Sequence, residues 1–227
     1  LNARRLDDQR ARYHDLLTSI LPAAVAERLQ RGETVVDEHS DVTVLFADIV
    51  GFTAMAARSR PDQILDLLNK LFAAFDEITA RHGLEKIKTI GDCYMAAGGV
   101  FDHQGAHASA MADLALAMQE AAARIDDPDG QPVRIRIGIH VGGLTAGVIG
   151  QRRFMYDLWG DTVNIASRMQ SLGEPDCIQV SDDLRRRLDS SYRLDPRGEI
   201  DVKGKGAMST WYLLGRDGGI NAEEDVS

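Results

Sequence analysis

Two aspartates stand where strand-like segments of the sequence end, and this placement is the clearest chemical signal in the chain. Asp48 follows the largely apolar residues 42–47, and Asp92 follows residues 84–90 and a glycine. A carboxylate at the end of a buried strand is costly unless a positive group meets it. Mg²⁺ typically takes one or two carboxylates together with the phosphates of a substrate. The pair predicts a metal-nucleotide site, whereas either aspartate alone could simply cap the following helix or turn.

Two further pairs of polar residues have spacings that suit ligand binding. Asn164 and Arg168 are four positions apart in a helical pattern, so both lie on one face of the helix. Lys203 and Lys205 alternate in a strand-like segment and share one of its faces. The alternatives are a solvated polar helix face for the first pair and an exposed lysine pair for the second.

The elements that must position these residues follow from the apolar pattern. A buried strand precedes Asp48, a strongly amphipathic helix follows, and a hairpin holds Asp92 in its turn. A second helix and a half-buried strand complete the unit. In chain order these elements cover residues 42–47, 61–82, 84–90, 93–97, 103–125 and 133–139. The order is the βαββαβ unit of ferredoxin-like folds, in the α+β class.

C-terminal αβ additions are expected beyond this core. They are a helix over residues 161–171, a strand over 177–180, a helix opened by Ser181 and a closing hairpin over about 192–214. The helix carries Asn164 and Arg168, so the additions must contribute to the site.

The N-terminal segment has a charged, helical pattern with a short apolar seam. Leu6, Tyr13 and Ile20 recur every seven residues, which predicts a coiled-coil transducer helix; the alternative is an amphipathic helix packed on its own domain. The expected boundaries are 1–32 for this segment, 33–216 for the catalytic domain and 217–227 for a flexible acidic tail.

Composition limits the possible partners and surroundings. The formal net charge of −9 over 227 residues argues against nucleic acid as a partner. Cys93 and Cys177 are the only cysteines, which fits a reducing, cytosolic environment. His103 and His107 lack a third ligand, so we expect them to face solvent rather than bind zinc. No apolar run reaches the ~20 residues that span a bilayer, and a chain beginning at Leu1 reads as a fragment of a longer protein.

Four segments together resemble the class III nucleotidyl cyclases. They are residues 46–53 (FADIVGFT), 86–92 (KIKTIGD), 136–140 (RIGIH) and 159–169 (WGDTVNIASRM). The resemblance covers nearly everything from Thr34 to Leu214. The N-terminal helix resembles the linker of mycobacterial-type, membrane-anchored adenylyl cyclases. The resemblance therefore implies the cytoplasmic domain of a membrane protein.

The resemblance also implies a two-metal site that holds a nucleoside triphosphate. Asp48, Asp92 and the Ile49 carbonyl would hold two Mg²⁺ or Mn²⁺ ions per active site. Ions held there would lower the pKa of the ribose 3′-OH and neutralise the phosphates. Backbone N–H groups around Gly51, Phe52 and Thr53 would cradle the phosphates, because a helix N-terminus favours anions.

Four more residues take roles by the same resemblance. Asn164 would position the ribose, and Arg168 would stabilise the charge that builds on the α-phosphate. Arg136 and Lys203 would bind the β- and γ-phosphates, with Lys205 as the alternative to Lys203.

Lys88 and Asp157 carry the expected base selection. Adenine presents an acceptor at N1 and a donor amine at C6, which a lysine donor and an aspartate acceptor match. Guanine presents the opposite polarity, at about 1–3 kcal/mol per unsatisfied buried group. Guanylyl members of the resembled family carry Glu and a small Cys-like residue at these positions, so the sequence favours ATP.

A single copy of each element implies two subunits per site. Lys88 and Asp92 lie roughly 13 Å apart along an extended strand, too far for one small substrate to meet both from one hairpin. In the resembled family a head-to-tail homodimer combines the Asp48 set of one subunit with the Asn164 set of the other. We therefore expect an adenylyl cyclase that makes 3′,5′-cyclic AMP and pyrophosphate from ATP. The alternatives are a guanylyl or relaxed-specificity cyclase and a silent nucleotide-binding dimerisation module.

Overall fold

Strand β1 (Val36–Ile49) lies inside the sheet, between β3 (Cys93–Gly98) and β4 (Ile135–Ile149), and is antiparallel to both. β2 (Glu85–Ile90) pairs with β3, so this half of the sheet has the order β2-β3-β1-β4. The structure is a computed structural model that describes residues 21–101, 105–150, 154–202 and 204–217.

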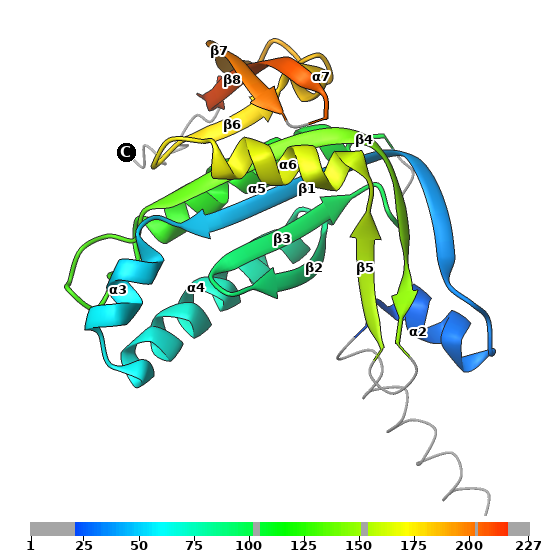
Figure 1. Ribbon diagram of the computed structural model, residues 1–227, viewed down its shortest axis with the longest axis horizontal. Helices are drawn as coiled ribbons and strands as arrows, with labels where there is room; N and C mark the ends of the chain where they lie inside the picture. Colours follow the sequence, from blue (N-terminus) through cyan, green and yellow to red (C-terminus); the bar gives the residue numbers. More distant parts are fainter. Residues whose placement is uncertain (1–20, 102–104, 151–153, 203, 218–227) are drawn as a thin grey trace, which may run out of the picture.

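Two helices connect these strands and cover one face of the sheet (Figure 1). α4 (Pro61–Arg81) lies between β1 and β2 in the chain, and α5 (His107–Ala122) lies between β3 and β4. α4 buries Leu67, Leu71 and Phe75, which recur at helical spacing and so form one apolar stripe. This arrangement confirms the expected ferredoxin-like βαββαβ core.

The C-terminal additions extend the sheet past β4. β6 (Ile178–Ser181) runs parallel to β4, and the hairpin of β7 (Tyr192–Val202) and β8 (Gly206–Arg216) adds two more strands through β8. α6 (Asp161–Ser171) precedes β6, and the short α7 (Asp182–Arg185) follows it. The expected helix, strand and closing hairpin are therefore confirmed.

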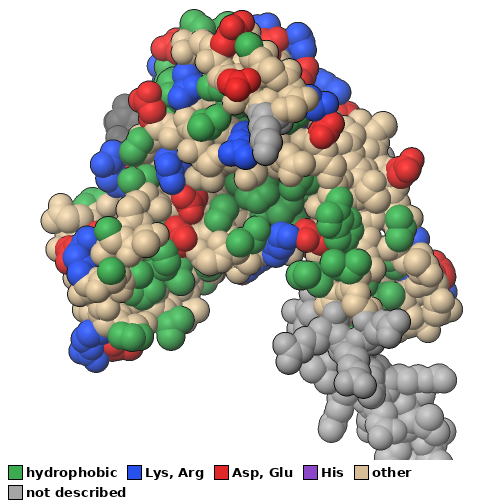
Figure 2. Space-filling view, viewed as in Figure 1, with side chains coloured by type: hydrophobic (Ala, Val, Ile, Leu, Met, Phe, Trp, Pro, Cys, Tyr) green, Lys and Arg blue, Asp and Glu red, His purple; other side chains and the backbone are tan. Residues whose placement is uncertain are grey.

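The alternation of side chains along β1 separates two layers. Leu45 and Ala47 pack in the cluster that contains the α4 and α5 side chains, while Val44 and Phe46 belong to the cluster on the other face. Asp48 continues the second series, because successive side chains of a strand point to opposite faces. That second face carries α6 along one border and is hollow beside it, with hydrophobic side chains gathered in the hollow (Figure 2).

The sheet contains more strand than the sequence pattern indicated. β1 and β4 extend well beyond residues 42–47 and 133–139, and β5 (Met155–Trp159), which was not expected, pairs with the second half of β4. Glycines in residues 142–150 interrupt the apolar pattern there. At least one of these glycines is needed because two backbone segments approach closely: a Cβ on Gly147 would stand 2.7 Å from the Val35 carbonyl oxygen.

Beside this β4–β5 hairpin lies the short helix α2 (Ala23–Gln30), which falls within the N-terminal segment of residues 1–32 (Figure 1). The N-terminal coiled-coil seam and residues 218–227 of the acidic tail lie outside the described residues. Within the described ranges, no helix is long and apolar enough to cross a membrane. His107 corrects an expectation: its side chain is 8% exposed and bonds Thr43 Oγ1 through Nδ1 at 2.7 Å, because α5 packs it onto β1.

Candidate functional site

Asp48 and Asp92 come together at one end of the sheet. Asp48 is the penultimate residue of β1, and Asp92 sits in the β2–β3 turn, where Gly91 adopts a positive φ of 63°. The two carboxyl groups lie close enough to interact with each other. Burial, followed by this contact and the Asp48 charge, raises the pKa of Asp92 to about 6. Two crowded carboxylates of this kind disfavour their own ionisation unless a cation lies between them.

Two other side chains donate hydrogen bonds to Asp48. Arg136, directly opposite in the β1–β4 ladder, donates from Nη2 to Asp48 Oδ2 at 2.9 Å. Gln170 of α6 donates from Nε2 to the same oxygen at 3.1 Å. Arg136 Nε is buried and has no hydrogen-bond partner among the described residues, so a further acceptor would satisfy it.

This end of the sheet fits a divalent cation that also binds phosphates. The two carboxylates are the set that Mg²⁺ uses together with substrate oxygens, and the unpartnered Arg136 nitrogen suits a phosphate oxygen. Among the described residues, no group of three or more His, Cys, Asp and Glu forms a complete protein cage for a metal. The residues therefore fit a metal that takes further ligands, such as phosphate oxygens, from outside this pair of carboxylates.

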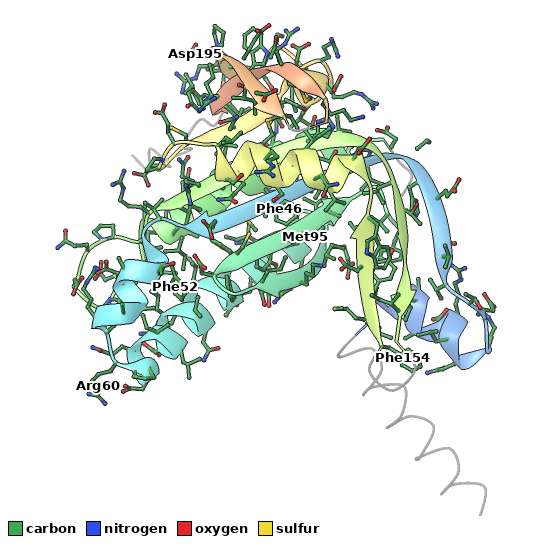
Figure 3. The ribbon with its side chains drawn as sticks, in the orientation of Figure 1. Phe46, Phe52, Arg60, Met95, Phe154 and Asp195 are labelled. Carbon is green, nitrogen blue, oxygen red and sulfur yellow. The ribbon has the colours of Figure 1, made fainter. Side chains whose placement is uncertain are left out.

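The turn after β1 leads directly into a helix. Gly51 adopts φ 74° as the N-cap of α3 (Phe52–Arg58), and its carbonyl accepts from Met55 N at 3.0 Å. A positive φ favours glycine there, and a Cβ on Gly51 would meet nothing within 4 Å. Figure 3 places Phe52 at the start of this helix, next to the end of β1. The expected phosphate cradle of Gly51, Phe52 and Thr53 thus follows Asp48 within a few residues.

Lys88 and Asp157 form a close ion pair between β2 and β5. Lys88 Nζ lies 2.5 Å from Asp157 Oδ2, and their side chains are 28% and 9% exposed. Asp157 Oδ1 accepts a second bond from the Leu158 backbone N–H at 2.8 Å. The unexpected strand β5 is what brings Asp157 to Lys88, 69 residues away in the sequence.

Asn164 and Arg168 line a cavity of about 500 Å³ beside α6. Lys205 lines the same cavity and pairs with Asp161 at 2.7 Å between Nζ and Oδ2. Lys203 lies outside the described residues. The residues that line this cavity are Asp161, Asn164, Ile165, Ser167, Arg168, Ser171, Val202 and Lys205. Neither Asp48 nor Asp92 is among them.

One chain therefore presents its candidate residues in separate groups. Asp48, Asp92 and Arg136 meet at the end of β1, whereas Asn164 and Arg168 face the α6 cavity. Sequence reasoning did not select Gln170, which touches the first group. Glutamine in a polar helix pattern carries no signal of its own, and its partner lies 122 residues away.

Comparisons with known proteins place the chain among one kind of enzyme domain. The family described as the adenylate and guanylate cyclase catalytic domain matches residues 34–215. An adenylate cyclase of Mycobacterium tuberculosis is 47% identical over 213 residues, covering 93% of this chain and 48% of the relative. The soluble guanylate cyclase subunit beta-2 of Rattus norvegicus is 41% identical over 220 residues, covering 96% of this chain and 32% of the relative.

A solved structure agrees with these sequence matches. The guanylate cyclase domain of RhGC from Catenaria anguillulae, in complex with GTP, has a TM-score of 0.77 and 35% identity. The similarity covers 80% of this chain and all of that domain. The chain spans about half the length of the mycobacterial relative, and relatives with both nucleotide preferences resemble it.

Proposed function

The chain belongs to the adenylate and guanylate cyclase catalytic domain family, and from this premise we propose that it converts ATP to 3′,5′-cyclic AMP and pyrophosphate in a homodimer. Cyclase activity on a nucleoside triphosphate follows from the family. The preference for ATP is our own inference, since adenylate and guanylate cyclases are both similar to this chain. The single observation that carries it is the close contact between Lys88 and Asp157.

The Lys88–Asp157 pair has the polarity that the adenine edge requires. Lys88 Nζ donates to N1 of the base, and the Asp157 carboxylate accepts from the C6 amine. Both side chains are mostly buried, so a base of opposite polarity leaves donors facing donors and acceptors facing acceptors at about 1–3 kcal/mol per group. A site that hydrogen-bonds its substrate rejects a mismatched analogue strongly for this reason.

The end of β1 supplies the metal and phosphate contacts. Asp48, the Ile49 carbonyl and Asp92 would hold two Mg²⁺ or Mn²⁺ ions, which when bound would lower the pKa of the 3′-OH and neutralise phosphate charge. The unpartnered Arg136 nitrogen donates to a β- or γ-phosphate oxygen. Backbone N–H groups at Gly51, Phe52 and Thr53 bind further phosphate oxygens.

The α6 cavity supplies the groups that act on the ribose and the α-phosphate. The ribose 3′-oxygen forms a bond to the α-phosphorus while the bond from that phosphorus to the departing pyrophosphate breaks. Asn164 orients the ribose for this in-line attack, and Arg168 stabilises the charge that develops on the α-phosphate oxygens. A lysine of the β7–β8 turn, Lys203 or Lys205, contacts the terminal phosphates. Lys205 lines the cavity with Asn164 and Arg168, which makes it a candidate equal to Lys203.

A head-to-tail homodimer joins these groups into complete sites. Within one chain the α6 cavity does not include Asp48 or Asp92, so one nucleotide needs the α6 side of one subunit and the β1 end of another. A two-fold axis then generates two identical sites. A silent nucleotide-binding module is the rival, but such a module has no need for two carboxylates and the Asn164–Arg168 pair.

The proposal extends to the surroundings of the domain. The boundaries 1–32, 33–216 and 217–227 divide the chain into a helical transducer, the catalytic domain and a tail. We propose a membrane-anchored parent with this domain in the cytoplasm, on the resemblance of its N-terminal sequence to the linker of membrane-anchored cyclases.

Release of cyclic nucleotide from ATP and from GTP with Mn²⁺ tests the proposal. We expect cyclic AMP from the wild-type chain and from Arg124→Ala, which changes a side chain 80% exposed on the surface, but not from Arg168→Ala. Preference for GTP would reassign the enzyme as a guanylyl cyclase. No cyclic product from either nucleotide would favour the silent module.

A further inference from the structure

Asp48 Oδ2 accepts hydrogen bonds from two donors of different charge. Arg136 reaches it from the neighbouring strand at 2.9 Å, and Gln170 reaches it from α6 at 3.1 Å. Gln170 is 7% exposed, and among the described residues no other side chain of α6 hydrogen-bonds to the end of β1. Burying an amide is costly unless it is satisfied, so this contact accounts for a glutamine at a core position.

The close packing of α6 on β4 fixes where Gln170 can reach. Gly138 lies two residues beyond Arg136 on the same face of β4, and a Cβ there would clash with the backbone N of Gln170. The helix backbone therefore rests directly on the sheet at this point. Because the backbone is fixed, the Gln170 amide has a short and defined path to Asp48.

We propose that Gln170 is a positioning residue that orients the Asp48 carboxylate for a divalent cation and links it to α6. This inference rests on the proposed function only in naming that cation as part of a cyclase site. Both donors bind Oδ2, from two different elements, and so restrict the orientation of the Asp48 carboxylate next to Asp92. Outer partners of a ligating carboxylate commonly set its orientation, and losing one typically weakens metal binding.

The chemistry of an amide suits this position. A second cation beside Arg136 would cancel the charge of Asp48 and oppose metal binding, whereas glutamine donates a hydrogen bond without adding charge. The same helix carries Asn164 and Arg168 on its other side. Through its hydrogen bond, Gln170 therefore connects the Asp48 carboxylate to the helix that presents the ribose- and α-phosphate-binding groups.

Gln170→Met tests the proposal, because methionine keeps the unbranched shape and removes the donor. Mn²⁺ affinity, measured without nucleotide from the electron paramagnetic resonance signal of free Mn²⁺, is expected to fall about 10- to 100-fold. Cyclase activity should fall with it at low Mn²⁺ and recover at high Mn²⁺, because the ligands remain. Asp48→Ala should not recover at any Mn²⁺ concentration.

Met169→Leu is the matched control, since it alters the neighbouring buried side chain of α6 without touching Asp48. It should bind Mn²⁺ like the wild type. If Gln170→Met fails to fold in a thermal melt, Gln170→Leu carries the same test. Wild-type Mn²⁺ affinity in a folded Gln170 variant, or an equal loss in Met169→Leu, would overturn the proposal. Mn²⁺ binding that depends on Gln170 in a chain that releases no cyclic nucleotide would refute the proposed function alone.

Discussion

Replacing Lys88 with Glu and Asp157 with Cys should change both the stability of the protein and its preference between ATP and GTP. The double variant should lose ATP preference, because each replaced group then opposes the adenine edge. With about 1–3 kcal/mol per mismatched group, two groups amount to about 2–6 kcal/mol. At about 1.4 kcal/mol per tenfold change, the ratio of kcat/KM for ATP over GTP should fall about 30-fold to 20,000-fold.

The stability of the Lys88→Glu single variant should differ from that of the double variant, since the two side chains touch at 2.5 Å. Lys88→Glu places a carboxylate against Asp157, which is 9% exposed, and leaves the buried charge without its partner. Breaking a fully buried pair costs about 3–5 kcal/mol; because Lys88 is 28% exposed, solvent screening reduces this to about 1–3 kcal/mol. Asp157→Cys added to Lys88→Glu should restore part of that stability, so the changes are not additive.

Initial rates with each nucleotide at saturating Mn²⁺, together with urea unfolding of all four proteins, measure both effects. Lys86→Glu is the control, because Lys86 lies on the same strand but pairs with Asp76. It should leave the ATP-over-GTP ratio unchanged. An unchanged ratio in the double variant would remove Lys88 and Asp157 from base selection. Equal destabilisation by Lys88→Glu and by the double variant would refute the reasoning about the pair.

Three further perturbations have defined outcomes. Asp92→Ala should abolish cyclic nucleotide release without lowering the urea midpoint, because it removes one of two crowded carboxylates; retained activity would contradict this. Gly138→Ala should lower the free energy of unfolding by about 3 kcal/mol or more, because the methyl group meets the α6 backbone, and a neutral result in urea unfolding would contradict that packing. Burial lowers the pKa of His140 to about 4, with Asp183 opposing and Lys205 assisting, so stability present at pH 7 is lost as pH falls from about 6.5 to about 4. The free energy of unfolding, measured by urea unfolding, should fall by about 3 kcal/mol between pH 7 and pH 4, and His140→Asn should remove most of this loss; an unchanged pH dependence in that variant would assign the loss to other groups.

Local patterns were sufficient to predict the elements that bear most candidate residues. The helix over residues 161–171 was predicted with its observed bounds, because Ile165, Ala166 and Met169 recur at helical spacing. Asp48 was predicted at a strand end, where β1 does end. These features depend on periodicity within a dozen residues, which a sequence displays directly.

Contacts between distant segments were beyond such patterns. Strand β5 forms by pairing with the extended β4, and the glycines of residues 142–150 conceal that pairing in the sequence. Gln170 reads as one more polar helix residue until the register of β1 against β4 places Asp48 beneath it. Tertiary register, rather than local propensity, decided both.

Mixing two inactive variants tests the shared site most directly. Asp48→Ala lacks part of the β1 end, and Arg168→Ala lacks part of the α6 cavity, so neither homodimer contains a complete site. Random exchange of subunits makes half of the dimers mixed, each with one complete site of two, so the equal mixture should regain about a quarter of wild-type cyclic AMP formation. A mixture that stays inactive, although labelled subunits have exchanged, would contradict a site built from two chains.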